Sequence, residues 1–292
     1  MPGQKTTYHA APSATPTACP NETIRQLHER KSVRAFTPEP VSVADERAVL
    51  EAACQAPTAG NEQLYSIIVV RDQAKKDALA ASCDNQPFIA KAPLVLAFCA
   101  DVRRWRRGFA LAGADPREPG AGDFLLAVED TMIAAQNAVV AAHSLDLGSC
   151  YIGDILERRE QQASLLGCPR YVVPAAMLVM GHPTPGQLAR RKPRRFELEG
   201  VVFENRYQDL SDEDLRALLA QKEGHTADPD DGFEAWLAAF CRRKWNSGFS
   251  REMSASVART LADFTYAANG TLEEPAATAD AAPDAAGEGK AR

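Results

Sequence analysis

One long apolar segment restricts the fold of this chain more than any other feature. Between Phe124 and Ala142, apolar residues recur at intervals of three and four, which is the period of an α-helix. Most of the residues between these positions are apolar too, among them Leu125, Ile133 and Val140. Such a helix offers little polar surface to water and must be covered on most sides. We therefore expect it to run through the domain core or a subunit interface.

Three short runs of mostly apolar residues predict buried strands at 65–70, 93–100 and 174–183. Strands of this length need a sheet to pair with, and helical patterns separate them along the chain. The order of elements disfavours a barrel and favours helices on both sides of a modest sheet.

Residues that cap helix N-termini precede three further predicted helices: Asn21, Ser42 and Asp72. The last third of the chain is again helical but less apolar. One apolar stripe there consists of Phe233, Trp236, Leu237 and Phe240. We expect the final helix to dock through Met253 and Val257.

Composition divides the chain into three parts. Residues 1–20 are rich in Pro, Thr and Ala and lack the apolar core of a secretory signal, so we expect a flexible arm. Residues 21–266 carry the periodic patterns and are expected to form one domain. Residues 267–292 are dominated by Ala, Asp, Glu, Pro and Gly, which bury too little surface to fold, and this predicts a disordered tail.

Charge and cysteine usage exclude several classes of protein. The formal net charge of -6 gives no general attraction to nucleic acid, and the apolar runs are short for membrane spans. The seven cysteines are odd in number, with no Cys-x-x-Cys pair, and the five histidines are scattered. This pattern argues against a disulfide framework or a metal site and favours a reducing cytoplasm.

Two basic runs are the candidate anion sites: "ERKSVRAF" (29–36) and "RRKPRR" (190–195). Arginine forks and a lysine charge suit a phosphate ester, and two such runs could converge on one phosphate. Taken alone, the first run also suits a solvated helix end, and the second a nucleic-acid patch. No Walker loop, serine elbow or His-Glu-x-x-His motif is present, so no protein nucleophile stands out.

Four stretches in this order resemble the nitroreductase superfamily of flavin mononucleotide (FMN) enzymes. They are "ERKSVRAF", "APTAGNEQLYSIIVVRD", "DLGSCYIGD", and "MGHPTPGQLARRKPRR" followed by "VVFENRY". The resemblance covers roughly 22–261 and is strongest to the flavin reductase and oxygen-insensitive nitroreductase branch. It implies an α+β fold with a central, mostly antiparallel sheet flanked by helices, in a domain-entwined homodimer with FMN at the interface.

The resemblance also assigns roles to residues. It places Arg30, Lys31 and Ser32 at the phosphate and ribityl chain, Arg34 towards flavin N1, and Thr58, Asn61 and Gln63 in a loop that hydrogen-bonds the flavin. It places the backbone of Tyr151, Ile152 and Gly153 near N5, and Lys192 with Arg194 in a second phosphate clamp. No side chain is expected to act as a catalytic acid, base or nucleophile, because the flavin carries the hydride.

The implied activity is two-electron, ping-pong reduction of nitroaromatics, quinones or similar electron-poor small molecules by NAD(P)H. Flavin reduction, enone reduction and reductive dehalogenation remain open on the same scaffold, with a nucleic-acid module as a remote alternative. Asp154 departs from the family pattern, which often has glycine there, and a carboxylate at the ring edge would affect the acceptor site. The basic runs 103–107 and 242–244 have no counterpart, and we expect either 2'-phosphate contacts or a solvated face.

Overall fold

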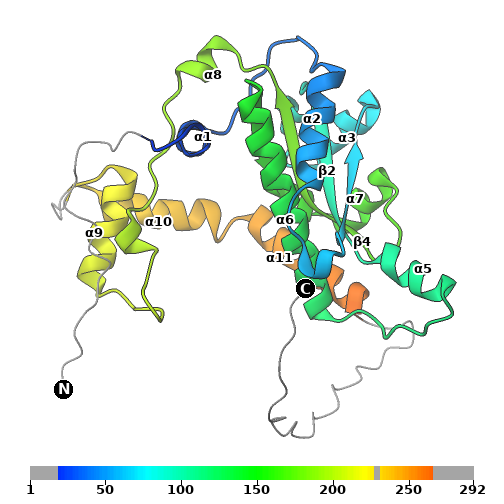
Figure 1. Ribbon diagram of the computed structural model, residues 1–292. Helices are drawn as coiled ribbons and strands as arrows, with labels where there is room; N and C mark the ends of the chain where they lie inside the picture. The colour runs from blue at the N-terminus through cyan, green and yellow to red at the C-terminus, as the bar shows by residue number, and fades with distance from the viewer. Residues whose placement is uncertain (1–18, 227–230, 266–292) are drawn as a thin grey trace, which may run out of the picture.

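A four-stranded antiparallel sheet organises the residues that the computed structural model describes, 19–226 and 231–265 (Figure 1). Its order is β1-β2-β4-β3, and the strands are β1 (Tyr65–Val69), β2 (Leu94–Asp101), β3 (Gly148–Ile152) and β4 (Val172–Gly181). The three predicted strands are confirmed as β1, β2 and β4. The edge strand β3 was missed, since its Gly-Ser-Cys start lacks an apolar alternation.

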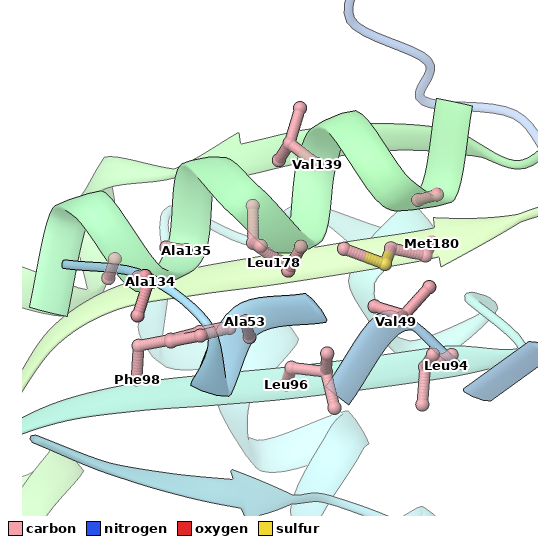
Figure 2. Packing of buried hydrophobic residues seen from close by; sticks show 14 of the residues in the cluster. Val49, Ala53, Leu94, Leu96, Phe98, Ala134, Ala135, Val139, Leu178 and Met180 are labelled. Carbon is pink, nitrogen blue, oxygen red and sulfur yellow. The ribbon is translucent and has the colours of Figure 1, made fainter. Parts of the chain in front are cut away.

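The predicted long helix is α6 (Ala121–Ser144), and it lies with α2 (Val43–Cys54) on one face of the sheet. Figure 2 shows side chains of α2, α6, β2 and β4 meeting in this core. Small residues such as Ala134, Ala135 and Ala138 are fully buried and let α6 lie close to the strands. By length and composition alone, α6 matches a membrane span. The core helices of water-soluble domains can match it in the same way.

Larger apolar residues of α6 lie on its other side, where Leu125 is 59% exposed and Ile133 is 41% exposed. We expected this helix to be covered on most sides. In the single chain, only its alanine face is covered. The remaining face has the apolar character of a protein interface.

The opposite face of the sheet is covered by α3 (Gln73–Ser82), α4 (Pro87–Ala90), the short η2 (Gly153–Leu156) and α7 (Arg159–Leu166). The remaining elements before α6 are α1 (Glu22–Glu29), η1 (Ala59–Asn61) and α5 (Arg103–Leu111). The predicted caps are confirmed, because Asn21, Ser42 and Asp72 each accept a backbone N–H of the helix that follows.

After β4 the chain forms α8 (Pro185–Ala189), η3 (Leu198–Gly200), α9 (Asp212–Glu223), α10 (Phe233–Lys244) and α11 (Gly248–Thr265). Figure 1 shows α9 and α10 standing away from the sheet, while α11 returns to α6. The buried residues of α11 are Ser256, Thr260 and Phe264. Met253 and Val257 are only partly buried, so the docking face is rotated from the expected one.

Most of the expected N-terminal arm (1–20) and all of the expected tail (267–292) lie outside the described residues. Their predicted character therefore stays a prediction. Both regions adjoin ordered elements, since α1 begins at Glu22 and α11 ends at Thr265.

Candidate functional site

The segment 30–37 contacts the free edge of β3 at one end and the residues that follow β4 at the other. The Val33 N–H donates to the Ser149 carbonyl at 2.9 Å, and Thr37 N–H donates to His182 O at 2.8 Å. Gly148 makes this approach possible, because a Cβ there would lie 2.7 Å from the Val33 side chain. The basic run is thus held by a parallel bridge from Ser32 to Ser149 and an antiparallel bridge from Phe36 to Pro183, with Val33 buried.

Arg30 is the most unusual side chain in this segment. Its guanidinium is half-buried, and its Nε and one Nη atom are buried without a hydrogen-bond partner among the described residues. Burial lowers the pKa of Arg30 from its ordinary value. A cation held in this way costs free energy unless an anion joins it, so the site is suited to a negatively charged ligand.

Two lysines fasten the segments around Arg30 to each other. Lys31 Nζ donates to the carbonyl of Leu188 at 2.6 Å and also to that of Arg190. Lys192 Nζ donates to Leu27 O at 3.0 Å and to His28 O at 2.7 Å. The expected phosphate ligands therefore also join the end of α1 to the loop after α8, where Lys192 complements the helix C-terminus.

Two arginines of the second basic run, 190–195, interact with different parts of the chain. Arg194 Nη1 donates to Gln221 O of α9 at 3.1 Å, away from Arg30. The charge of Arg195 acts on Arg30 and Lys192 and lowers the pKa of both, although burial is the larger cause in each. Arg30, Lys192 and Arg195 are thus close enough for their charges to interact, and with Lys31, which adjoins Arg30, they are called the cationic cluster. The phosphate clamp of Lys192 with Arg194 stays a prediction.

The predicted stretch 151–153 adjoins this cluster at the end of β3. Burial raises the pKa of Tyr151 to about 12, and the charge of Arg30 opposes this shift. The Tyr151 hydroxyl donates to Gln136 Oε1 of α6 at 3.3 Å. Ile152 is buried, whereas Gly153 is exposed with nothing within 4 Å of the position of a Cβ. The backbone at Gly153 is therefore open to a flat ligand.

Asp154 does not project freely at this loop. Its carboxylate accepts a hydrogen bond from Gln86 Nε2 at 2.7 Å and lies against Glu157, which is 4% exposed. Burial, and then the charge of Asp154, raise the pKa of Glu157 to about 7. The carboxylate expected at the ring edge is thus part of an acidic pair beneath η2. Sequence reasoning missed Gln86 and Glu157, which no motif marks.

The predicted amide-reading loop, 58–63, is held by a buried acid that sequence reasoning also missed. Asp130 of α6 is 2% exposed and accepts the N–H groups of Ala59 at 2.9 Å and Leu64 at 3.1 Å. These bonds support a strained turn in which Asn61 has φ 58° and Gln63 has φ 51°. The sequence signal that could have identified Asp130 is that it is a single acid on the apolar face of a core helix.

The two halves of the expected site lie apart along α6. Asp130 anchors the 58–63 loop near the middle of this helix, whereas Arg30 lies close enough to His143 near the helix end to lower the His143 pKa, although burial lowers it more. Thirteen helical residues separate Asp130 from His143, or roughly 20 Å along the axis. One chain therefore does not bring Thr58, Asn61 and Gln63 to the cationic cluster.

The basic run 103–107 forms part of α5 and is used largely inside the chain. Arg104 donates to Gln63 O at 3.4 Å and to Tyr65 O at 3.3 Å, and Arg106 pairs with Glu118 at 2.7 Å. These contacts support the 58–63 loop and the segment before α6. Within the described ranges, no group of three or more His, Cys, Asp or Glu could hold a metal ion.

Comparisons with known proteins agree with this arrangement. The family model described as "Nitroreductase family" matches residues 27–182. An FMN reductase (NADPH) from Bacillus subtilis is 33% identical over 201 residues, which are 68% of this chain and 79% of the relative. An oxygen-insensitive NADPH nitroreductase from Salmonella typhimurium is 38% identical over 195 residues, or 67% of this chain and 78% of the relative.

Solved structures show the same fold. The NADPH:FMN oxidoreductase from Vibrio harveyi, in complex with NAD+, superposes with a TM-score of 0.68 at 26% identity, covering 82% of this chain and 98% of that one. The NfrA1 nitroreductase from B. subtilis also gives a TM-score of 0.68, at 27% identity, and covers 80% and 98%. The α+β prediction and the resemblance are therefore confirmed. The family match spans the Arg30 segment, the 58–63 loop and β3, and the chain belongs to the Nitroreductase family.

Proposed function

We propose that this protein is an FMN-dependent NAD(P)H oxidoreductase that reduces nitroaromatics, quinones or similar electron-poor small molecules by two electrons. The observation that carries the proposal is that Nε and one Nη of half-buried Arg30, inside a cationic cluster, have no hydrogen-bond partner among the residues the structure describes. A phosphate monoester carries close to two negative charges near neutral pH and would provide the missing hydrogen-bond acceptors. The residues present therefore fit FMN.

In this proposal Arg30, Lys31, Lys192 and Arg195 hold the phosphate, and Ser32 and Arg34 follow along the same extended segment. The Arg34 side chain is exposed, and its backbone N–H is held by Gln187 Oε1 at 3.1 Å. Bound FMN supplies the hydride chemistry at its isoalloxazine ring. A cation such as Arg34 near that ring would favour the added negative charge of the reduced form.

The proposal includes a homodimer. In it, the 58–63 loop of one copy would complete the site that begins with Arg30 of the other copy. The open apolar face of α6 has the character of such an interface, with Leu125 and Ile133 exposed in the single chain. The names of the relatives, FMN reductase and NADPH nitroreductase, support the cofactor and co-substrate. The absence of disulfides among the described cysteines is compatible with a cytoplasmic location.

The test is flavin binding by an Arg30→Ala variant. Loss of charged hydrogen bonds to the phosphate should weaken FMN affinity by about 10- to 100-fold, measured by titration of the flavin fluorescence of the apoprotein. Arg191→Ala is the matched control, since Arg191 is exposed and lies in the same basic run. Purified protein that takes up no flavin, or equal affinity in both variants, would refute the assignment.

The acceptor is tested separately with a steady-state panel of nitroaromatics, quinones, free flavin, enones and halogenated aromatics. Parallel lines in double-reciprocal plots are expected for NAD(P)H and a nitroaromatic or quinone acceptor, because one product leaves before the second substrate binds. Strict preference for free flavin, an enone or a halogenated substrate would replace the nitroreductase activity by another flavin reaction on the same scaffold.

A further inference from the structure

Two cysteines from distant parts of the sequence meet at the far end of the sheet. Cys99 of β2 and Cys168, which follows α7, are 69 residues apart, and their Sγ atoms are 4.0 Å from each other. Cys99 is fully buried and Cys168 is half-buried. Both are free thiols, and the proposed flavin site uses neither of them.

The backbone on both sides holds these thiols in place. A β-bulge in the pairing of β2 with β4 lies between Phe98 and Cys99 and re-aims the strand at this point. On the other side, Gly167 adopts φ 67° and the Cys168 N–H donates to Ala163 O at 2.8 Å, as at an αL helix end. The proximity of the two sulfur atoms therefore follows from the fold and does not depend on a flexible loop tip.

The surroundings give the two thiols different chemistry. Cys168 lines a cavity of about 500 Å³ between α7, the start of β4 and α11, whereas Cys99 lies behind it in the core. The hydrogen bond from the Cys99 thiol lowers the pKa of Cys168. That same bond, together with burial, raises the pKa of Cys99. Cys168 is thus the accessible thiol that ionises first, with a second thiol beside it.

We propose that Cys99 and Cys168 form a reversible disulfide when hydrogen peroxide reaches Cys168 through this cavity. In the first step the Cys168 sulfur attacks one peroxide oxygen, so that an S–O bond forms, the O–O bond breaks and the second oxygen leaves as water after protonation. In the second step the Cys99 sulfur attacks the sulfenic acid, and the S–O bond gives way to an S–S bond with release of a second water. Two thiols are oxidised by two electrons and one peroxide is reduced.

This oxidation site is separate from the cationic cluster. Cys99 is paired with Pro174 in β4, whereas Ser149, which binds the Arg30 segment, is paired with Met180. Six strand residues separate these pairs, or roughly 20 Å. Disulfide formation can therefore be measured independently of flavin binding, and its failure would leave the proposed function untouched.

The test is peptide mapping of the purified full-length protein, with any flavin it carries, after graded treatment with hydrogen peroxide. Free thiols are blocked, and the protein is digested without reductant. A cross-linked peptide containing Cys99 and Cys168 is expected, with a mass about 2 Da below the sum of the reduced peptides and full reversal by dithiothreitol. The Cys54→Ser variant, which lacks an exposed thiol, is the matched control and should form the same link.

A Cys99→Ala variant identifies the order of the steps. It should stop at the sulfenic acid of Cys168, which dimedone then labels several-fold more than in the wild type. Equal labelling in the two proteins would overturn the proposal. Absence of the 99–168 link at peroxide doses that oxidise the exposed Cys54 would also overturn the proposal. This measurement uses the wild type, so it tests the proposal even if the variant does not fold.

Discussion

Glu157 is a buried carboxyl group whose ionisation should limit the stability of the protein above neutral pH. The residue is 4% exposed, and its Oε1 lacks a hydrogen-bond partner among the described residues. The charges of Asp154 and Asp84 raise its pKa, and the charge of Arg158 opposes them. Burial, followed by Asp154, raises its pKa from 4.5 to about 7 in the folded protein. In the unfolded chain the same group ionises near its ordinary value.

The sign and the magnitude follow from proton linkage. Between pH 4.5 and about 7 the folded protein holds a proton on Glu157 that the unfolded chain has lost, so the free energy of unfolding falls as pH rises. The slope is about 1.4 kcal/mol per pH unit, and the total loss reaches about 3 kcal/mol above pH 7. Below pH 4.5 both states are protonated and the effect vanishes.

Glu157→Gln should remove this penalty. Glutamine keeps the volume of the side chain and can donate to Asp154 as the protonated acid does, but it cannot ionise. The variant should match the wild type near pH 4.5 and exceed its free energy of unfolding by up to about 3 kcal/mol at pH 8.

Urea unfolding followed by circular dichroism at a series of pH values between 4.5 and 8 measures this difference. Other titrating groups contribute equally to both proteins and cancel. Glu213→Gln, at an exposed position of α9, is the matched control and should show no such divergence. A difference between the Glu157→Gln variant and the wild type that stays constant across this range would refute the reasoning.

Three further substitutions probe the scaffold of the site. Asp130→Asn leaves one of the N–H groups of Ala59 and Leu64 without a carboxylate acceptor; urea unfolding should show a loss of about 1–3 kcal/mol, and an unchanged midpoint would contradict the role of Asp130. Gly148→Ala places a Cβ 2.7 Å from Val33. The variant should separate the Arg30 segment from β3 and lower both the melting temperature and the FMN affinity. Normal values of both would exclude this tight contact. Lys192→Met removes two carbonyl contacts at the end of α1. Amide hydrogen exchange should accelerate in α1, with exchange in α3 as the internal control, and unaltered protection of α1 would argue against the fastening role.

Local sequence signals predicted most of the elements correctly. The caps at Asn21, Ser42 and Asp72, the periodicity of α6 and the apolar runs of β1, β2 and β4 all depend on residues close together in the chain. Interactions of that range are written in the sequence pattern itself. β3 was missed because its own residues lack the apolar alternation of a strand. Its pairing with β4 and with the Arg30 segment holds it in the sheet.

Sites built from distant residues could be predicted only in outline. The basic run at 29–36 was recognised as an anion site by composition and by the resemblance. The structure adds that two guanidinium nitrogens of half-buried Arg30 have no partner in the described part of the chain. Composition alone does not show that Arg195 acts on Arg30 while Arg194 donates to Gln221. Asp130 and Gln86 had no motif, since their partners lie far away in sequence.

The sequence by itself determined the family, the alternation of helices and strands, and the cations available to a phosphate, because these depend on residue type and short-range spacing. Tertiary structure alone decided which of those groups meet. It joined both lysines to backbone carbonyls, placed Asp154 beside Glu157, anchored the 58–63 loop to Asp130 of α6, and brought Cys99 to Cys168. The physical reason is that side-chain partners, burial and pKa shifts depend on contacts between residues distant in sequence, which become fixed only when the sheet and its helices pack.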